Sequence, residues 1–174
     1  MRKLASIQVV NAAEPIANAD AIERIRVLGW WVVVKKGEFK PGDRLVYCEI
    51  DSLLPERPEF EFLRANSFKP AVTDDAGVPV QPAGFRIKTV MLRGQVSQGI
   101  CFPLSVLPPG APTDEGADVT DALAVRKWEP PVPVGMGGRV KGGFPGYLPK
   151  TDETRVQVHE PVLERHRGKL FYVT

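Results

Sequence analysis

The residues Lys150-Thr151-Asp152-Glu153 come closest to a motif for covalent chemistry. They nearly match the pattern lysine, any residue, Asp/His/Asn, glycine, in which the lysine amine forms a phosphoramidate with AMP. Glycine is required there because the backbone approaches the nucleotide closely, and the Glu153 side chain would crowd it. None of the ten lysines is followed by the complete pattern. We therefore predict no catalytic residue, Lys150 included.

Phosphate binding is the second chemistry that the sequence suggests. The segment between Ala76 and Thr113 has basic but no acidic residues, and several lysines follow Val34. A local basic strip of this kind could follow a nucleic-acid backbone, although an ordinary solvated surface is an equal alternative. The candidate phosphate contacts are Lys35, Lys36, Lys40, Arg86, Lys88 and Arg93.

Trp30 and Trp31 are neighbours in an expected strand, so their side chains must point to opposite faces. Only one of them can enter the interior of a barrel, and the other needs a partner outside it. That partner could be a stacked base, the expected short helix near residue 60 or the later connector. We favour the two structural options.

Metal and nucleotide-loop motifs are incomplete. Cys48 and Cys101 lie in apolar runs, and the two histidines lack the spacing of metal ligands, so we expect buried free thiols and no metal site. The glycine-rich stretch 135–143 contains two glycines spaced as in a P-loop, but Gly143 stands where the lysine is required. We interpret this stretch as a flexible linker.

The elements that must position these residues are short strands. Runs rich in branched and aromatic residues predict strands over 4–10, 22–27, 30–34, 44–50, 85–92 and 97–102, with a short helix over 59–65. Turn signals at 40–43 and 93–95 predict hairpins between the third and fourth runs and between the last two. We predict a mainly β protein, a small closed Greek-key barrel of the OB type, in preference to a two-sheet sandwich.

The composition changes after Leu107. The chain has 16 glycines and 17 prolines, and about half of them fall between Pro108 and Pro149. Within this range we expect a short helix through Val125, capped by Asp118 or Thr120, and docking by Trp128. The predicted parts are a barrel domain over 1–107, a Pro/Gly-rich connector over 108–149 and an incomplete second domain over 150–174.

Overall composition is that of an ordinary globular domain, 43% hydrophobic and 25% charged, with a net charge of +2. This balance does not identify a nucleic-acid binder, so any basic surface must be local. No apolar run approaches the roughly 20 residues that span a bilayer, and no signal-peptide pattern begins the chain. We therefore predict a cytoplasmic protein with no membrane partner.

Several blocks of the sequence together resemble the amino-terminal OB domain of ATP-dependent RNA ligases, which seal nicks that have a 3′-hydroxyl RNA end. The blocks are Ala17–Glu23, Val33–Phe39, Gly42–Ser52 and Leu92–Gly99. Residues 149–157 resemble the segment with which the nucleotidyltransferase domain of that family begins. The resemblance covers nearly the whole chain, in order.

The resemblance implies a reaction that uses ATP and a divalent metal, Mg or Mn. A lysine is adenylated, AMP passes to the 5′-phosphate, and the 3′-hydroxyl displaces it. In that family the strand matching Leu170–Thr174 leads into the adenylated lysine, so we expect this chain to be an N-terminal part that neither ligates alone nor binds a cofactor. Its expected partners are nicked duplex RNA or RNA/DNA and the missing C-terminal ligase domain. Lys150 and Arg155 are candidates for nucleotide-domain contacts, and surface pairing with Asp152 or Glu153 is the alternative.

Two other functions fit the same residues. The block at 17–22 also resembles OB modules that bind tRNA in synthetase-like proteins, which would make the chain a free-standing RNA- or tRNA-binding protein without catalytic activity. A purely protein-binding OB domain is the third possibility. Preference for a nick over intact duplex or tRNA separates the first two, and absence of nucleic-acid binding at low salt indicates the third.

Overall fold

A computed structural model describes residues 3–73, 77, 79–130 and 164–169 of the chain, and these are mainly β structure. The first strands are β1 (Ala5–Pro15), β2 (Ile22–Val27), β3 (Trp30–Lys35), β4 (Arg44–Cys48), β5 (Ser52–Leu54), β6 (Phe68–Lys69) and β7 (Val72–Thr73). The later strands are β8 (Pro79–Gln81), β9 (Gly84–Arg86), β10 (Val90–Leu92), β11 (Gln95–Ser97), β12 (Ile100–Phe102) and β13 (Arg126–Lys127). The helices are the 3-10 helices η1 (Pro58–Leu63) and η2 (Leu104–Val106) and the α-helix α1 (Arg64–Ser67). None of the described helices is long and apolar enough to cross a membrane.

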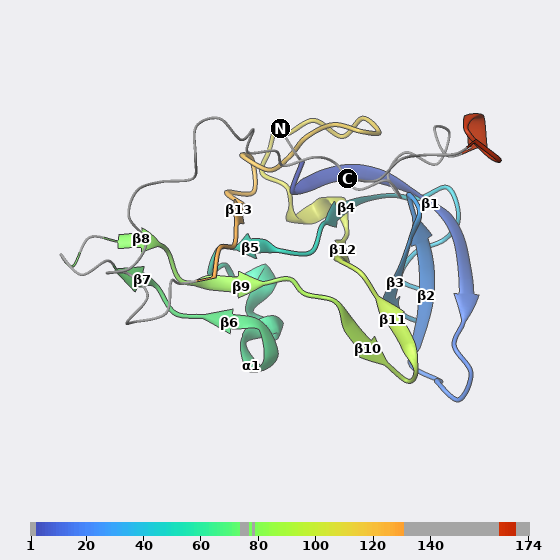
Figure 1. Ribbon diagram of the computed structural model, residues 1–174, viewed down its shortest axis with the longest axis horizontal. Coiled ribbons are helices and arrows are strands. Elements are labelled where there is room, and N and C mark those ends of the chain that lie inside the picture. The colour runs from blue at the N-terminus through green and yellow to red at the C-terminus, as the bar shows by residue number, and fades with distance from the viewer. Residues whose placement is uncertain (1–2, 74–76, 78, 131–163, 170–174) are drawn as a thin grey trace.

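The central feature is a nearly closed barrel of five antiparallel strands in the order β12-β4-β1-β2-β3 (Figure 1). The gap between β3 and β12 is bridged by the residues that precede β12. The Gln98 N–H donates to the carbonyl of Trp31 at 3.0 Å, and the Val33 N–H donates to Ser97 Oγ at 2.9 Å. This order, in which β1 pairs with both β2 and β4, is a Greek key of the OB type. The predicted fold class is confirmed.

The predicted hairpin between the third and fourth strands is wrong. β4 pairs with β1 and β12, whereas β3 pairs with β2. The 40–43 turn packs on β1 instead, because the Gly42 N–H donates to the Val10 carbonyl and the Val10 N–H donates to the Asp43 carbonyl. The turn signal located the reversal of the chain but not the strand that pairs after it. The other predicted turn is confirmed, since β10 and β11 pair with Arg93 and Gly94 at the tip.

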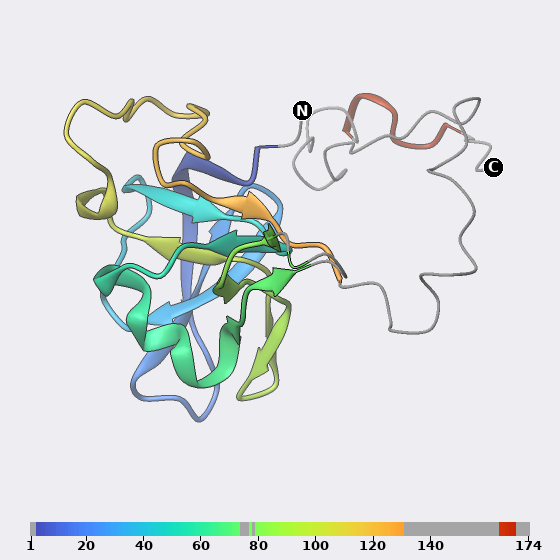
Figure 2. The same cartoon turned by 90° about the vertical axis from the view of Figure 1, so that its left-hand side faces the viewer.

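The predicted strand over 85–92 is divided between two sheets. Its first part, β9, lies in a second sheet in the order β13-β5-β9-β6, and its last part, β10, pairs with β11. Figures 1 and 2 show η1 and α1 beside this second sheet. There the Phe68 and Phe85 rings meet edge to face, with centroids 6.2 Å apart. The predicted helix over 59–65 therefore corresponds to η1 and α1, which cover one side of the second sheet.

Two apolar clusters hold these layers together, and β4 separates them. The Leu45 and Tyr47 side chains point into the barrel, where they pack with Val10, Ile25 and Val32. Val46 and Cys48 point the other way, into a second cluster under β5, β9 and η1. Because strand side chains alternate, β4 is buried on both faces. The barrel therefore cannot be separated from the elements beside it without exposing a core.

Residues 116–128, which the sequence assigned to the connector, pack against the barrel. The N–H groups of Gly116 and Val119 donate to β1 carbonyls, and Asp118 forms a bridge with Ser6. Val119 and Leu123 are fully buried in the second cluster. The division at residues 107 and 149 stays a prediction, and residues 116–127 of the predicted connector pack on the barrel and the second sheet.

The expected short helix through Val125 is replaced by hydrogen-bonded turns. Asp118 does cap this segment, because its Oδ1 accepts the Thr120 N–H at 2.9 Å. Ala124, however, has a φ of 54°, which a helix cannot contain. The Thr120 hydroxyl is also occupied, since it accepts the N–H groups of Leu4 and Ala5 at 3.1 Å each. The segment therefore hydrogen-bonds to the backbone at the start of β1.

The two cysteines are buried free thiols, as predicted. Burial raises the pKa of the Cys48 thiol from 9.0 to about 12, and burial, followed by the nearby Cys48 and Glu38, raises the pKa of Cys101 well above 9.0. At pH 8 we expect neither thiol to react with a disulfide reagent unless the chain opens, because the thiolate is the nucleophile. Stability contributed by the two protonated thiols should be fully present below pH 9 and lost as the pH rises toward 12. Thiol titration with and without urea checks the first expectation, and rapid reaction of either thiol in the folded chain would contradict it.

Candidate nucleic-acid interface

The outward faces of β2 and β3 form the most distinctive surface of the barrel. Ile25 and Val27 of β2 point into the core and are fully buried, so Arg24 and Arg26, which alternate with them, point outward and are half-buried. The strand register sets Arg26 opposite Trp31, whose side chain is also half-buried. This outer face of β2 and β3 combines two guanidinium groups with an indole ring.

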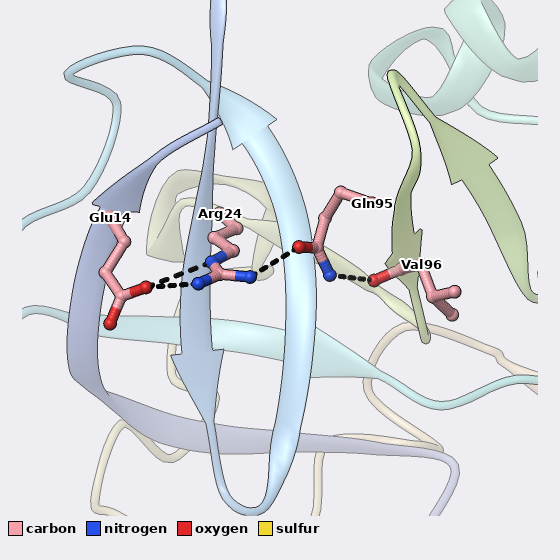
Figure 3. Close-up of polar contacts among 4 residues, drawn as sticks. All are labelled: Glu14, Arg24, Gln95 and Val96. Carbon is pink, nitrogen blue, oxygen red and sulfur yellow. Dashed lines mark hydrogen bonds and ion pairs between the residues drawn. The ribbon is translucent and has the colours of Figure 1, made fainter. Parts of the chain in front are cut away.

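Arg24 is the centre of a hydrogen-bond network that joins three strands (Figure 3). Its Nε and Nη2 donate to Oε2 of Glu14 on β1, at 3.1 and 2.5 Å. Its Nη1 donates to Oε1 of Gln95 on β11 at 2.6 Å, and the Gln95 amide donates in turn to the Val96 carbonyl at 2.8 Å. The guanidinium carbon lies 4.4 Å from the centre of the Trp31 ring. The network ties the β10–β11 hairpin to the barrel and holds Arg24 over the indole.

The two tryptophans point to opposite faces, as predicted. Trp30 lies in the barrel core and is 9% exposed, whereas Trp31 lies on the outer face. The expected partner of the outward tryptophan was the short helix or the connector, and this is wrong. The Arg24 guanidinium on the neighbouring strand covers the ring instead.

Lys35, Lys36 and Arg93 lie at one end of the outer face. Lys35 ends β3 and Lys36 follows it, and both side chains are exposed. Arg93 lies at the tip of the β10–β11 hairpin, which runs beside β3 through the Val33–Ser97 and Trp31–Gln98 contacts already described. Gln98 contacts Trp31 and Ser97 contacts Val33, so β11 and β3 run in opposite directions. The hairpin tip, which precedes Gln95, therefore lies toward the end of β3 that carries the lysines. Three of the six predicted basic residues therefore share one region.

Lys40 lies in the turn between β3 and β4, which bonds to β1. The turn that contains it is hydrogen-bonded to Val10, which is the register partner of Val27, whereas Lys35 pairs with Ile22. The grouping of Lys40 with Lys35 and Lys36 as phosphate contacts therefore stays a prediction.

Arg86 and Lys88 belong to a third region, on and after β9 of the second sheet. Arg86 Nη2 forms an ion pair with Asp51 at 3.0 Å, and its guanidinium carbon lies 3.5 Å from the centre of the Trp128 ring. Its Nε is buried and has no hydrogen-bond partner, so stacking and one ion pair hold the side chain. Trp128 thus docks the end of the described connector, as predicted. Arg86 is already paired, whereas Lys88 is exposed.

The structure therefore distributes the six predicted residues over three regions, and their role as phosphate contacts stays a prediction. Sequence reasoning missed Arg24 and Arg26, although a signal was available. Alternation over 22–27 puts both side chains on one face, and the two-residue turn at 28–29 fixes the register that brings them to Trp31. The acidic neighbours Glu14 and Glu23 offset their charge, so this segment shows no basic excess in the sequence.

No metal site is evident in the described ranges, where no group of three or more His, Cys, Asp or Glu side chains could hold a metal ion. The metal that the resemblance implies for the whole ligase therefore finds no such cluster in residues 3–73, 77, 79–130 and 164–169. The candidates Lys150 and Arg155 lie outside these residues.

Comparison with known proteins supports both the fold and the resemblance. A family model described as an OB-fold domain matches residues 4–104. No curated protein matches the chain in sequence. Among solved structures, the RNA ligase of Naegleria gruberi with PPi matches with a TM-score of 0.77 and 41% identity over 97% of this chain and 48% of that one. A mutant of the same ligase with ATP and Mn matches with a TM-score of 0.77 and 40% identity over 96% and 48%. The chain thus spans about half the length of the solved ligases that it matches.

Proposed function

We propose that this chain, which belongs to the OB-fold domain family and is similar to an RNA ligase over 97% of its length, is the nucleic-acid-binding module of an ATP-dependent RNA ligase. In this role it engages a nicked duplex of RNA or RNA/DNA, so that a nucleotidyltransferase domain can join the 3′-hydroxyl and 5′-phosphate ends. The observation that carries the proposal is 41% identity to an RNA ligase over 97% of the chain. The free-standing tRNA-binding alternative has no comparable support.

The surface chemistry agrees with this role. In OB folds the face of the second and third strands and the adjoining loops bind oligonucleotides. Here that face carries Arg24, Arg26 and Trp31, with Lys35, Lys36 and Arg93 at one end. Exposed cations attract a phosphate backbone without sequence preference, as a nick-sealing enzyme requires.

ATP and a divalent metal, Mg or Mn, would serve the adenylation chemistry of the whole ligase. A solved relative holds ATP and Mn, and the described residues of this chain offer no cluster of metal ligands. We therefore assign both cofactors to the part of the ligase that corresponds to the other half of the solved relatives, and Lys150 and Arg155 to contacts with that part. In this proposal the present chain supplies the binding surface for the nucleic acid.

Reversing the charge at Lys35, Lys36 and Arg93 together is expected to weaken binding to a nicked RNA duplex by roughly 10- to 100-fold at low salt. Each phosphate contact that is lost should also reduce the slope of log K against log salt by about 0.9. Fluorescence anisotropy with a labelled nicked duplex at several salt concentrations measures both quantities.

The matched control is Lys40→Glu, an exposed lysine in the turn that bonds to β1 rather than on the outer face of β2 and β3. It should leave most of the affinity intact. A triple variant that keeps the wild-type affinity and salt slope would show that this end of the sheet does not contact phosphates. Equal affinity of the wild-type chain for nicked duplex, intact duplex and tRNA would favour the free-standing RNA-binding alternative, and no binding at low salt would favour a protein-binding module.

A further inference from the structure

The outer face of β2 and β3 contains a planar pair, Trp31 with Arg24 above it, whose chemistry differs from that of the exposed lysines. Arginine recognises phosphate through N–H groups in the plane of the guanidinium, and two of these commonly donate parallel hydrogen bonds to the anion. In Arg24, Nε and Nη2 already donate hydrogen bonds to Glu14, and Nη1 donates to Gln95 (Figure 3). Glu14 also offsets the positive charge. Arg24 is therefore poorly suited to bind a backbone phosphate.

What remains available is the flat surface of the pair. One third of the Arg24 side chain is exposed, at 33%, and Glu14 is 45% exposed, so the stack lies at the surface. The in-plane hydrogen bonds from β1 and β11 fix the orientation of the guanidinium, and the indole supports it from below at 4.4 Å. A guanidinium that is fixed in this way loses little side-chain entropy when a flat ligand stacks on it. The site is thus preorganised for stacking.

We propose that the Trp31–Arg24 pair is a stacking platform for one unpaired nucleobase of the bound nucleic acid. The inference rests on the proposed function and specifies what this face recognises. Unpaired bases stack on aromatic rings and on arginine planes, whereas the bases inside a duplex have both faces covered by their neighbours. The platform therefore takes a base at a frayed end, gap or overhang next to the nick. The lysines and Arg93 bind the backbone.

The experiment uses the whole chain and a short single-stranded oligoribonucleotide that carries one 2-aminopurine, whose fluorescence falls when it stacks. Trp31→Ala is expected to weaken binding roughly 5- to 150-fold, the loss associated with one stacked base. It should also abolish the quenching of 2-aminopurine. The salt slope should not change, because no phosphate contact is removed.

Two further variants keep the test decisive if Trp31→Ala disturbs the fold. Trp31→Phe keeps an aromatic face and should retain most of the affinity and quenching. Arg24→Lys keeps the charge opposite Glu14 but loses the plane, so it should weaken binding of the same probe with an unchanged salt slope. Val33→Ala, which removes only methyl groups on the same face opposite Arg24, is the matched control and should bind like the wild type.

The outcomes separate this inference from the proposed function. Undiminished binding and quenching by folded Trp31→Ala and Arg24→Lys chains overturn the platform, even if nicked duplex still binds through the lysines. A lower salt slope for Arg24→Gln, which removes the charge, means that Arg24 contacts phosphate, which also overturns it. If the wild-type chain binds neither probe at low salt, the proposed function itself fails.

Discussion

A chain that ends at Leu107 is expected to be unfolded, whereas one that ends at Pro130 is expected to unfold cooperatively like the whole chain. The shorter chain lacks Val119 and Leu123, which are fully buried, and Val125, which is 5% exposed. Burial of each such side chain contributes about 1.5 to 3 kcal/mol, and a small domain has only about 5 to 15 kcal/mol of net stability. The shorter chain also loses the hydrogen bonds from Gly116 and Val119 to β1. Circular dichroism and urea unfolding of both chains measure the difference.

A single substitution tests the same point within the whole chain. Leu123→Ala should lower the free energy of unfolding by about 2 to 5 kcal/mol, because it leaves a cavity in the cluster under β5 and β9. Leu92→Ala deletes the same atoms at a site that is 44% exposed, so it is the matched control and should cost less than about 1 kcal/mol. Equal stability of the two variants, or a cooperative 107-residue chain, would mean that residues 108–128 are an appendage of the barrel.

Sequence patterns predicted the strands of the barrel well because its interior is uniformly apolar. Ile25, Val27, Val32 and Val34 repeat every second residue, and all four point into the core. In the first strand Ser6 and Gln8 alternate with apolar residues, which is typical of a strand with one face in solvent, but they are 5% and 8% exposed. Residues 116–119 bond to this strand from far along the chain, and a local pattern contains no information about such a cover.

The candidate site was predicted in its residue types but not in its grouping. Alternation correctly assigned Trp30 and Trp31 to opposite faces. The grouping of basic residues depends on which strands pair, and the 40–43 turn leads into a strand that pairs with β1 rather than β3. Arg86 consequently lies in another sheet, and Lys40 lies in a turn that bonds to β1. Strand pairing is set by contacts distant in sequence, so it was the weakest element of the prediction.

Gly99 provides the second large effect, since it joins β11 to β12 where the barrel closes. Its φ is +92°, and a Cβ added there would lie 2.5 Å from Cε2 of Tyr47 and 2.7 Å from the Cys48 carbonyl oxygen. The Tyr47 ring cannot move aside easily, because it is 2% exposed and its hydroxyl donates to the Gln98 carbonyl at 3.0 Å. Gly99→Ala is therefore expected to destabilise the fold by about 3 kcal/mol or more, as measured by urea unfolding.

Two other glycines separate the causes of that effect. Gly94→Ala, at the hairpin tip, has a φ of +78° but no atom within 4 Å of the added Cβ, so it introduces backbone strain alone and should cost about 1 kcal/mol. Gly84→Ala has no positive φ but brings Cβ to 2.4 Å from the Leu54 carbonyl oxygen, so it introduces the clash alone. If the clash with Tyr47 dominates at Gly99, then Gly99→Ala and Gly84→Ala should both be much less stable than Gly94→Ala. If Gly99→Ala is as stable as Gly94→Ala, the close packing of Tyr47 against the β11–β12 junction is wrong, and with it the contact that closes the barrel beside the outer face.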